Sequence, residues 1–431
     1  MADLTNDSDV LIIGAGLAGL ACAVHLTEAG RRVTILEAGD GVGGRVRTDV
    51  VDGFVLDRGF QVLLTAYPEA KSILDYKALD LRPFAPGALI QIGAKRAKVV
   101  DPVRQFTSIL STAKAPIGTV LDKGRVALLR RELGRLDLSA LWERPDITTL
   151  QYLREQKFSA QMIDRFFRPL FGGIFLDRDL LTSSRMFEFV MRMLADGENA
   201  IPAIGMQAIP NQLAARLPAG TIRLGCRVGA VADHAVTLLD LGTVEAKTIV
   251  IATEGSQAAK LLGDSTASGA PGVADPGSVP VSCVYFAAEQ APIDQPFIVL
   301  NGDGAAAGPV NNLCVPSLVS AAYAPRGRHL VSASVLGSHR APDNASLEAA
   351  VTAQLKGWFG DQVTSWDHLR TYHVPHAQPR QAPPALSHIE RSVRVRTGVY
   401  VCGDHRDQAS IQGALTSGRR AAEAVLADAA L

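Results

Sequence analysis

The hydrophobic pattern near the start of the chain predicts a strand, a helix and a second strand in close succession. Residues 10–13 form an uninterrupted apolar run, which is typical of a parallel strand that is covered on both faces. A helical pattern then continues to residue 29 and ends at Gly30, a common helix stop. A second apolar run covers residues 33–36. This order predicts a βαβ unit and therefore an α/β fold.

The loop between the first strand and the helix has the spacing G-x-G-x-x-G, at Gly14, Gly16 and Gly19. Gly14 permits a tight turn, Gly16 lets the backbone approach a pyrophosphate, and Gly19 allows close packing of helix and strand. The free N–H groups at the start of the helix favour phosphate binding. Glu37 follows the second strand at about the 20-residue distance expected of an acid that binds a ribose hydroxyl. These residues together predict a dinucleotide-binding domain.

The residues after Glu37 separate flavin binding from nicotinamide binding. Residues 38–48 read AGDGVGGRVRT, so a glycine pair, Gly43-Gly44, precedes Arg45. This stretch resembles the extended FAD fingerprint of the flavin amine oxidase and phytoene desaturase superfamily of FAD-dependent oxidoreductases. The glycine pair lets the backbone close on the cofactor, and Arg45 can balance the charge of a pyrophosphate. The resemblance implies FAD as the cofactor.

Two further segments carry the same resemblance. Residues 51–61 resemble the stretch of this superfamily that passes beside the isoalloxazine ring, which implies that Gly59, Phe60 and Gln61 are neighbours of the ring. Near the end of the chain, a predicted strand ends in Gly-Asp at 403–404, and SIQGALTSGR follows at 410–419. This part resembles the terminal "GD…GA…SG" pattern of the superfamily. It implies that the helix near residue 411 points N–H groups at the O2/N1 side of the flavin, where negative charge accumulates on reduction.

The chain is expected to return to the cofactor domain near Gly205. A helix is predicted over 211–217, and strands are predicted at 221–224, 227–231, 235–239 and 248–253. These strands resemble a β-meander of the superfamily in which one residue lies against the adenine, followed by a return strand whose end touches FAD. The cofactor-binding residues assigned by all of these motifs are Gly14, Gly16, Leu17, Ala18, Gly19, Glu37, Ala38, Gly43, Gly44, Arg45, Gly59, Phe60, Gln61, Val228, Ala252, Thr253, Gly403, Asp404, Ile411, Gln412 and Gly413.

The positions of these motifs predict two interleaved domains. We expect a Rossmann-like FAD-binding domain made of 1–85, 205–265 and 390–431, and a mixed α+β substrate-binding domain made of 86–204 and 266–389. In the second domain, strands are predicted at 279–286 and 329–336. Residues 152–197 are predicted to be rich in helix and to cover the active site. Breaks are predicted there at Pro169 and at Gly172-Gly173.

Composition excludes several classes of function. Lys+Arg and Asp+Glu both count 43, so no net charge attracts nucleic acid. The five cysteines form no CxxC pair, which argues against a disulfide framework, and no metal site is predicted. The polar start of the chain and the absence of a run of about 18 apolar residues indicate a cytoplasmic protein. Basic residues outnumber acids over 95–135, where a solvated helical cap and a peripheral membrane contact both remain open.

The resemblance implies an FAD-dependent oxidoreductase, and two departures bear on its substrate. Ser410 stands where amine oxidases of the superfamily usually have an aromatic residue beside the amine. Those enzymes also commonly use a lysine from a substrate-domain strand, whereas only Lys260 and Lys356 follow residue 256 here. His373 and His376 have no acid or metal partner at a diagnostic spacing, so structural roles are expected for both histidines.

We therefore expect hydride transfer from a small apolar organic substrate to flavin N5, as in a desaturase or dehydrogenase, with an unknown electron acceptor. Such transfer needs mainly orientation and a dry pocket, so no acid–base pair is required and no catalytic residue is assigned. Two alternatives remain open. One is a flavin amine oxidase that uses oxygen, and the other is an FAD-dependent isomerase or a flavin-binding protein without turnover. The oligomeric state is not predicted.

Overall fold

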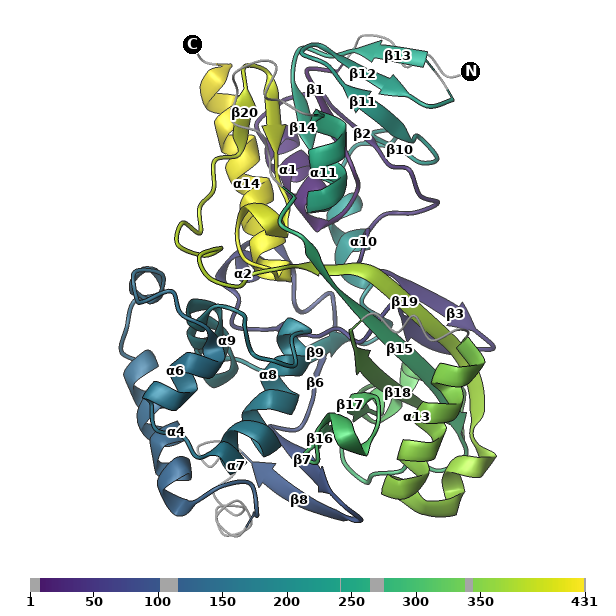
Figure 1. Ribbon diagram of the computed structural model, residues 1–431. Helices are drawn as coiled ribbons and strands as arrows, with labels where there is room; N and C mark the ends of the chain where they lie inside the picture. The colour runs from purple at the N-terminus through teal and green to yellow at the C-terminus, as the bar shows by residue number, and fades with distance from the viewer. Residues whose placement is uncertain (1–7, 101–114, 241, 264–274, 338–343, 430–431) are drawn as a thin grey trace.

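The computed structural model describes residues 8–100, 115–240, 242–263, 275–337 and 344–429 (Figure 1). A six-stranded sheet unites parts of the chain that lie far apart in the sequence. Its order is β10 (Ile222–Arg223), β2 (Val33–Leu36), β1 (Val10–Ile13), β14 (Ile249–Ile251), β21 (Val399–Val401) and β20 (Arg394–Arg396). All neighbours in it are parallel except β20 and β21. The predicted α/β fold is confirmed.

The alternation of side chains along β1 explains how both faces of this sheet are covered. Val10 and Ile12 belong to the core beneath α1 (Leu17–Glu28) and α14 (Ile411–Asp428). Leu11 and Ile13 point the other way, into a core shared with α11 (Gly255–Leu262). That core also includes a three-stranded antiparallel sheet of β11 (Val228–Val231), β12 (Ala235–Leu238) and β13 (Gly242–Glu245). The fully apolar run of β1 follows from burial on both sides.

A mixed seven-stranded sheet forms the second large layer. Its order is β19 (Asp367–Pro379), β15 (Ser278–Ala288), β18 (His329–Leu336), β17 (Val310–Cys314), β16 (Ile298–Asn301), β7 (Gly87–Ile92) and β8 (Lys95–Val100). Only β16 and β7 are parallel. The helix α13 (Asn344–Phe359) shares a buried core with β15 and β18. The basic stretch therefore begins as strand β8, and its residues 101–114 lie outside the described residues.

A helical layer lies beside this sheet (Figure 1), and in the chain it falls after β7 and β8 and before the remaining strands of the sheet. It consists of α4 (Val120–Leu133), α5 (Leu138–Leu141), α6 (Thr149–Glu155), α7 (Ala160–Met162), a π-helical turn (Ile163–Phe167), α8 (Arg168–Phe175) and α9 (Ser184–Asp196). The prediction of a helix-rich region is confirmed. Within the described residues, no helix combines the length and the apolar character needed to cross a membrane.

The predicted break at Gly172-Gly173 is wrong, because α8 runs through both glycines. A Cβ on Gly173 would lie 2.9 Å from the side chain of Asn311, which belongs to β17. Gly173 therefore allows close packing of helix and sheet, and Gly172 allows close approach of the turn at Asp177, which offsets their low helix propensity. Pro169 lies in the first turn of α8, directly after the π-helical turn Ile163–Phe167.

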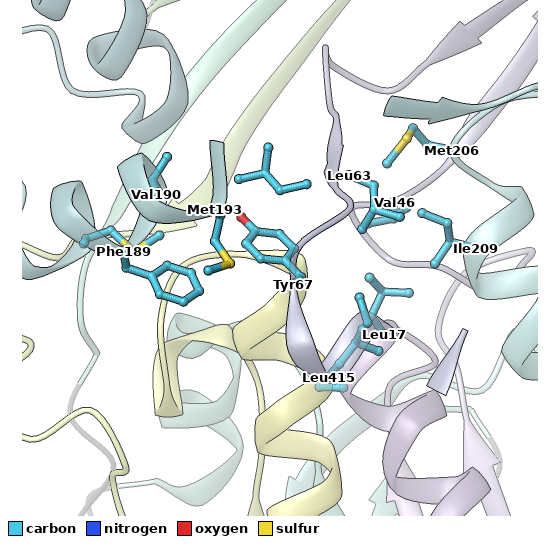
Figure 2. Close-up of a cluster of buried hydrophobic side chains, with 14 of the residues drawn as sticks. Leu17, Val46, Leu63, Tyr67, Phe189, Val190, Met193, Met206, Ile209 and Leu415 are labelled. Atoms are coloured by element: carbon cyan, nitrogen blue, oxygen red, sulfur yellow. The ribbon is translucent and has the colours of Figure 1, made fainter. Parts of the chain in front are cut away.

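Short elements connect the two layers. They comprise β3 (Thr48–Val51), β4 (Phe54–Asp57), β5 (Leu63–Leu64), α2 (Pro68–Ile73), β6 (Leu81–Pro83), β9 (Asn199–Pro202), α10 (Ala208–Ala214) and α12 (Pro316–Val319). The small sheet β5-β9-β6 joins segments that the sequence assigned to different domains, and the domain boundaries stay a prediction. Figure 2 shows the buried core in this region, where Tyr67 lies beside Phe189 and Met193 of α9. The rings of Tyr67 and Phe189 stack with centroids 6.0 Å apart.

Candidate functional site

The predicted cofactor motifs meet at one edge of the six-stranded sheet. The strands β1, β2, β14 and β21 are parallel neighbours, so their carboxyl ends lie together. Gly14 follows β1, Glu37 follows β2, Thr253 lies just beyond β14, and Gly403 lies just beyond β21. In open α/β sheets this edge is where ligands bind. The structure thus assembles segments from the two ends and the middle of the chain into one candidate site.

The glycine loop is shaped by contacts that exclude side chains. Gly14 has a φ of 104°, and a Cβ on Gly19 would lie 2.1 Å from the carbonyl oxygen of Gly14. A Cβ on Gly16, in contrast, would meet nothing within 4 Å. Gly16 therefore faces open space at the start of α1, whose first N–H groups, including those of Leu17 and Ala18, lack partners within the helix. An anionic group fits there.

The carboxylate of Glu37 joins the loop after β1 to the loop after β2. One carboxylate oxygen accepts the N–H of Ala15 at 2.7 Å, and the other accepts the N–H of Gly39 at 2.7 Å. Each oxygen keeps a further lone pair that a ribose hydroxyl could use. The carbonyl of Glu37 accepts the N–H of Cys226 at 2.8 Å, which brings the start of β11 and Val228 to this end of the site. Ala38 is exposed beside it.

An ion pair joins the early and the late motifs. The guanidinium of Arg45 donates to Asp404 at 2.7 Å and to the carbonyl of Ala377 at 2.9 Å. The side-chain amide of Gln61 donates to the carbonyl of Arg45 at 2.7 Å. The preceding glycine pair lies against the first loop, since the N–H of Gly43 donates to the carbonyl of Ala15 at 2.8 Å and a Cβ on Gly44 would lie 3.4 Å from Gly16. These contacts hold six predicted cofactor residues together.

Buried polar atoms without partners provide a test of whether FAD fits. Among the described residues, Oγ1 of Thr253 and Oε1 of Gln61 are buried and accept or donate no hydrogen bond. A buried polar atom without a hydrogen bond lowers the stability of the fold unless a bound group supplies that bond. A Cβ on Gly59 would meet only the side chain of Val374, at 3.9 Å, so this position is also open. The open glycines and the unsatisfied polar atoms fit a cofactor that carries phosphates, hydroxyls and a ring with polar edges.

The start of α14 offers backbone groups rather than side chains. Ser410 caps this helix by accepting the N–H of Gly413 at 3.0 Å, which leaves the N–H groups of Ile411 and Gln412 without helical partners. The side chain of Gln412 accepts the N–H of Glu69 at 2.9 Å and donates to Thr416 at 3.2 Å, so it is directed elsewhere. Gly413 is required by packing, because its Cβ would lie 2.0 Å from the carbonyl of Gln408.

A buried acid that the sequence did not single out lies two residues before Gly59. Asp57 accepts hydrogen bonds from Thr48 at 2.5 Å, from the N–H of Met206 at 2.9 Å and from the hydroxyl of Tyr323 at 2.9 Å. Burial raises the pKa of Asp57 to about 6, and these three donors oppose the rise. The donors come from segments far apart in the chain, so no local motif marks the cluster.

A cavity of about 310 Å³ opens between the helical layer and the seven-stranded sheet. It adjoins the start of α14, because Ala409 lines it and donates its N–H to the side chain of Gln381 at 3.0 Å. Its apolar lining includes Phe175, Met186 and Leu336. The other lining residues are Leu176, Asp177, Arg178, Asp179, Leu181, Thr182, Val279, Pro280, Gly337, Gln378, Pro379, Arg380, Gln381 and Ala382.

His373 and His376 of β19 do not line this cavity. His373 lies between the hydroxyl of Ser282, at 2.8 Å, and the side chain of Asn344, at 2.6 Å. His376 lies 2.7 Å from the hydroxyl of Ser278. Their partners are neutral hydroxyl and amide groups rather than acids. These contacts agree with structural roles for both histidines.

Comparison with known proteins identifies the family. The family model described as "Flavin containing amine oxidoreductase" matches residues 17–426. The chain is 26% identical over 211 residues to protoporphyrinogen oxidase 2 of Arabidopsis thaliana, covering 48% of this chain and 40% of that protein. It is 27% identical over 277 residues to putrescine oxidase of Kocuria rosea, covering 57% of this chain and 56% of that protein. The chain thus spans about half the length of these curated relatives.

The fold agrees with that assignment. The solved structure of an oxidoreductase from Methanosarcina mazei aligns with a TM-score of 0.74 at 17% identity, covering 96% of this chain and 99% of that one. This likeness establishes the fold, and the family match extends over nearly the whole sequence. The chain belongs to the family of flavin-containing amine oxidoreductases, and FAD is its cofactor.

Proposed function

We propose that this protein transfers a hydride from an apolar organic substrate to N5 of its flavin, as a desaturase or dehydrogenase does. The observation that carries the proposal is the cavity beside the start of α14, whose wall is partly apolar and whose lining, among the described residues, includes no histidine, cysteine, tyrosine or lysine. The flavin supplies the hydride acceptor when it is bound. The protein then needs to orient the substrate and exclude water, which apolar walls can do.

The residues at the sheet edge have distinct parts in this proposal. The open backbone at Gly16 and the start of α1 hold the pyrophosphate, and Arg45 balances its charge. Glu37 binds the ribose, and the free N–H groups at residues 411–412 favour negative charge at the O2/N1 edge. The side chain of Gln412 takes no part, because it is bonded to Glu69 and Thr416. The remaining motif residues supply backbone approach or packing.

Two observations favour this reaction over amine oxidation. Ser410, in the position expected for an aromatic cage residue, is a helix cap with a small polar side chain. Lys260 lies in α11, and Lys356 lies in α13, where it pairs with Asp361 at 3.1 Å. Neither lysine belongs to the seven-stranded sheet, whose lysines in the described strands, Lys95 and Lys98, both lie on its edge strand β8. An isomerase, or a flavin protein without turnover, remains a distinguishable outcome of the test below.

The proposal is tested by titrating the purified holoenzyme anaerobically with polyenes and other apolar compounds, and in parallel with amines. We expect an apolar substrate to bleach the oxidised flavin band at about 450 nm, the two-electron reduction that cofactor chemistry requires. Bleaching by amines alone would replace the proposal with amine oxidation. An unchanged flavin across the panel, with product of unchanged mass, would identify an isomerase.

A matched pair of variants locates the reaction in the cavity. Val279→Trp fills part of the lining and should slow flavin reduction by substrate while leaving the flavin content unchanged. Val50→Trp places the same side chain at an exposed position on β3 and should have no effect. Equal reduction rates in both variants would remove the cavity from the proposal.

We also propose that α4 contacts anionic membrane surfaces. Val120, Leu121 and Leu128 are 78%, 70% and 67% exposed, and the same helix carries the exposed Arg131. Apolar and basic side chains on one exposed helix favour an anionic bilayer. Vesicles of anionic lipid should float the protein at low salt, and the double change Leu121→Gln and Leu128→Gln should reduce flotation. Leu239→Gln, at a position 62% exposed, is the control, and no flotation at low salt would contradict the proposal.

A further inference from the structure

The cavity beside α14 continues into a second groove at the surface. Arg380 and Ala382 belong to the linings of both, so the groove adjoins the cavity. The groove is otherwise lined by Pro276, Pro384, Ala385, Ser387, His388 and Arg391. Its charged and titratable lining residues are thus all basic, although Lys+Arg and Asp+Glu are equal over the whole chain.

Two acids, Asp177 and Asp179, also line the inner cavity. Asp177 is already engaged, since it accepts hydrogen bonds from the N–H and the hydroxyl of Thr182, at 2.7 and 3.0 Å, and from the N–H of Asp179 at 3.2 Å. Asp179 itself is exposed. No ion pair between it and an arginine occurs within the described ranges.

Two arginines of the lining lack an anionic partner. Arg178 is half-buried, and its guanidinium donates only to the carbonyl of Pro309, at 3.3 Å. Burial lowers the pKa of Arg178, and the nearby charge of Asp179, which forms no ion pair with it, opposes that fall. The guanidinium of Arg380 makes no hydrogen bond or ion pair within the part of the chain that the structure describes. Arg391 differs, because it is bonded to the carbonyls of His405 and Ala385.

A partly buried guanidinium without an acid is costly, and a ligand anion can compensate it through strong, charge-assisted hydrogen bonds. The rest of the cavity wall is largely apolar, and its volume of about 310 Å³ is near the lower end of the range of ligand pockets. We infer that the substrate carries an anionic oxygen head group on an apolar body, and that Arg178 and Arg380 bind this head group. This inference rests on the function proposed above.

The test measures binding to the oxidised holoenzyme, without turnover, by calorimetry. The ligands share one alkyl chain and differ in the head group: decanoate, decyl phosphate, decanol and decylamine. We expect at least one of the two anions to bind about tenfold or more tightly than decanol and decylamine, as a desolvated charge pair implies. The two anions distinguish a carboxylate from a phosphate, and a shift in the flavin absorbance locates the ligand near the ring.

Variants assign the effect to the two arginines. Arg178→Gln and Arg380→Gln should each remove most of the anion preference, and Arg178→Lys should restore part of it. Arg326→Gln removes the same charge at an exposed position outside both linings and should retain the preference. Flavin content and thermal unfolding confirm that each variant is folded, and Arg380, being exposed, provides the safer of the two changes.

Equal affinity for all four head groups would overturn the inference, and so would an anion preference that survives both glutamine substitutions. The outcome is independent of the reaction. If decanoate binds through the arginines but no compound reduces the flavin, the inference stands and the proposed oxidoreductase function fails. If neutral apolar compounds reduce the flavin and the anions show no preference, the function stands and the inference fails.

Discussion

The two large sheets of this protein encode their sites in different ways. At the carboxyl edge of the six-stranded sheet, the geometry depends on backbone approach, as between Gly19 in the first turn of α1 and Gly14 in the loop before it. Beside the seven-stranded sheet, the cavity is assembled from side chains that come from α8, β15, β18 and the end of β19. A local spacing of glycines specifies the first, whereas only the complete fold brings the second together.

The difference extends to how polar groups are satisfied. Glu37 finds its donors, Ala15 and Gly39, in the two loops of one βαβ unit. Asp57, in contrast, takes its donors from β3, from the turn before α10 and from Tyr323. We conclude that the hydrogen bonds of Glu37 follow from one short motif, whereas those of Asp57 depend on long-range packing.

The largest expected effect comes from replacing one glycine by alanine at the cofactor edge and comparing it with the same change in the helical layer. In Gly19→Ala, the new Cβ would lie 2.1 Å from the Gly14 carbonyl, so α1 must move away from β1. We expect loss of bound FAD and a free energy of unfolding lower by about 3 kcal/mol, the upper end of overpacking costs. Flavin content after purification and urea unfolding measure both effects.

Gly124→Ala is the matched control, since Gly124 lies inside α4 and its Cβ would meet nothing within 4 Å. Here we expect a gain of up to about 1 kcal/mol from helix propensity, with FAD retained. If Gly19→Ala bound FAD as well as this control, the close approach at the glycine loop would not be what positions the cofactor.

Sequence reasoning succeeded where the signal is local. The strands at 10–13, 33–36 and 329–336 have the predicted bounds, and α14 begins at Ile411 as expected. It failed at β13 (Gly242–Glu245), a largely exposed edge strand whose polar residues carry no apolar alternation. The helix predicted over 211–217 begins earlier, at Ala208, because Pro210 is tolerated in its first turn.

In the candidate site, too, the sequence marked the cofactor residues but not the residues of the cavity. The sequence marked Arg45 and Asp404 separately, through motifs at opposite ends of the chain, and the structure joins them at 2.7 Å. It gave no role to Arg178, Arg380 or Gln381, because the cavity that they line exists only after β19 and the helical layer have packed. No pattern of residue types within one segment could have signalled that arrangement.

The second largest expected effect is the pH dependence of the free energy of unfolding that Asp57 contributes. A carboxyl whose pKa is raised to about 6 in the folded state binds its proton more tightly there than in the unfolded chain. The free energy of unfolding therefore falls as the pH rises from below 3.8, the ordinary pKa of an aspartate side chain, through 6. This group alone should account for a loss of about 2 kcal/mol between about pH 4.5 and about pH 7.

Asp57→Asn should abolish that part of the pH dependence, because the amide does not titrate and the hydroxyl of Tyr323 can turn to accept its N–H. Urea unfolding at the two pH values gives the change in the free energy of unfolding for each protein. Subtracting one change from the other removes the contribution of other groups that titrate in this range, such as Asp407. Parallel curves for the two proteins would show that the folded state does not raise the pKa of Asp57.

The smallest expected effect comes from removing a helix cap. Two caps of similar geometry can be compared, one at the cofactor edge and one in the helical layer. Ser410 caps α14 with a hydrogen bond of 3.0 Å, and Thr148 caps α6 with one of 3.1 Å. Replacing either residue by alanine should lower the free energy of unfolding by about 1 kcal/mol. Only Ser410→Ala should also weaken FAD binding, by a few-fold, because the amides at 411–412 are proposed to face the flavin. If Thr148→Ala weakened FAD binding equally, the loss would reflect stability alone, and the start of α14 would have no separate part in holding the cofactor.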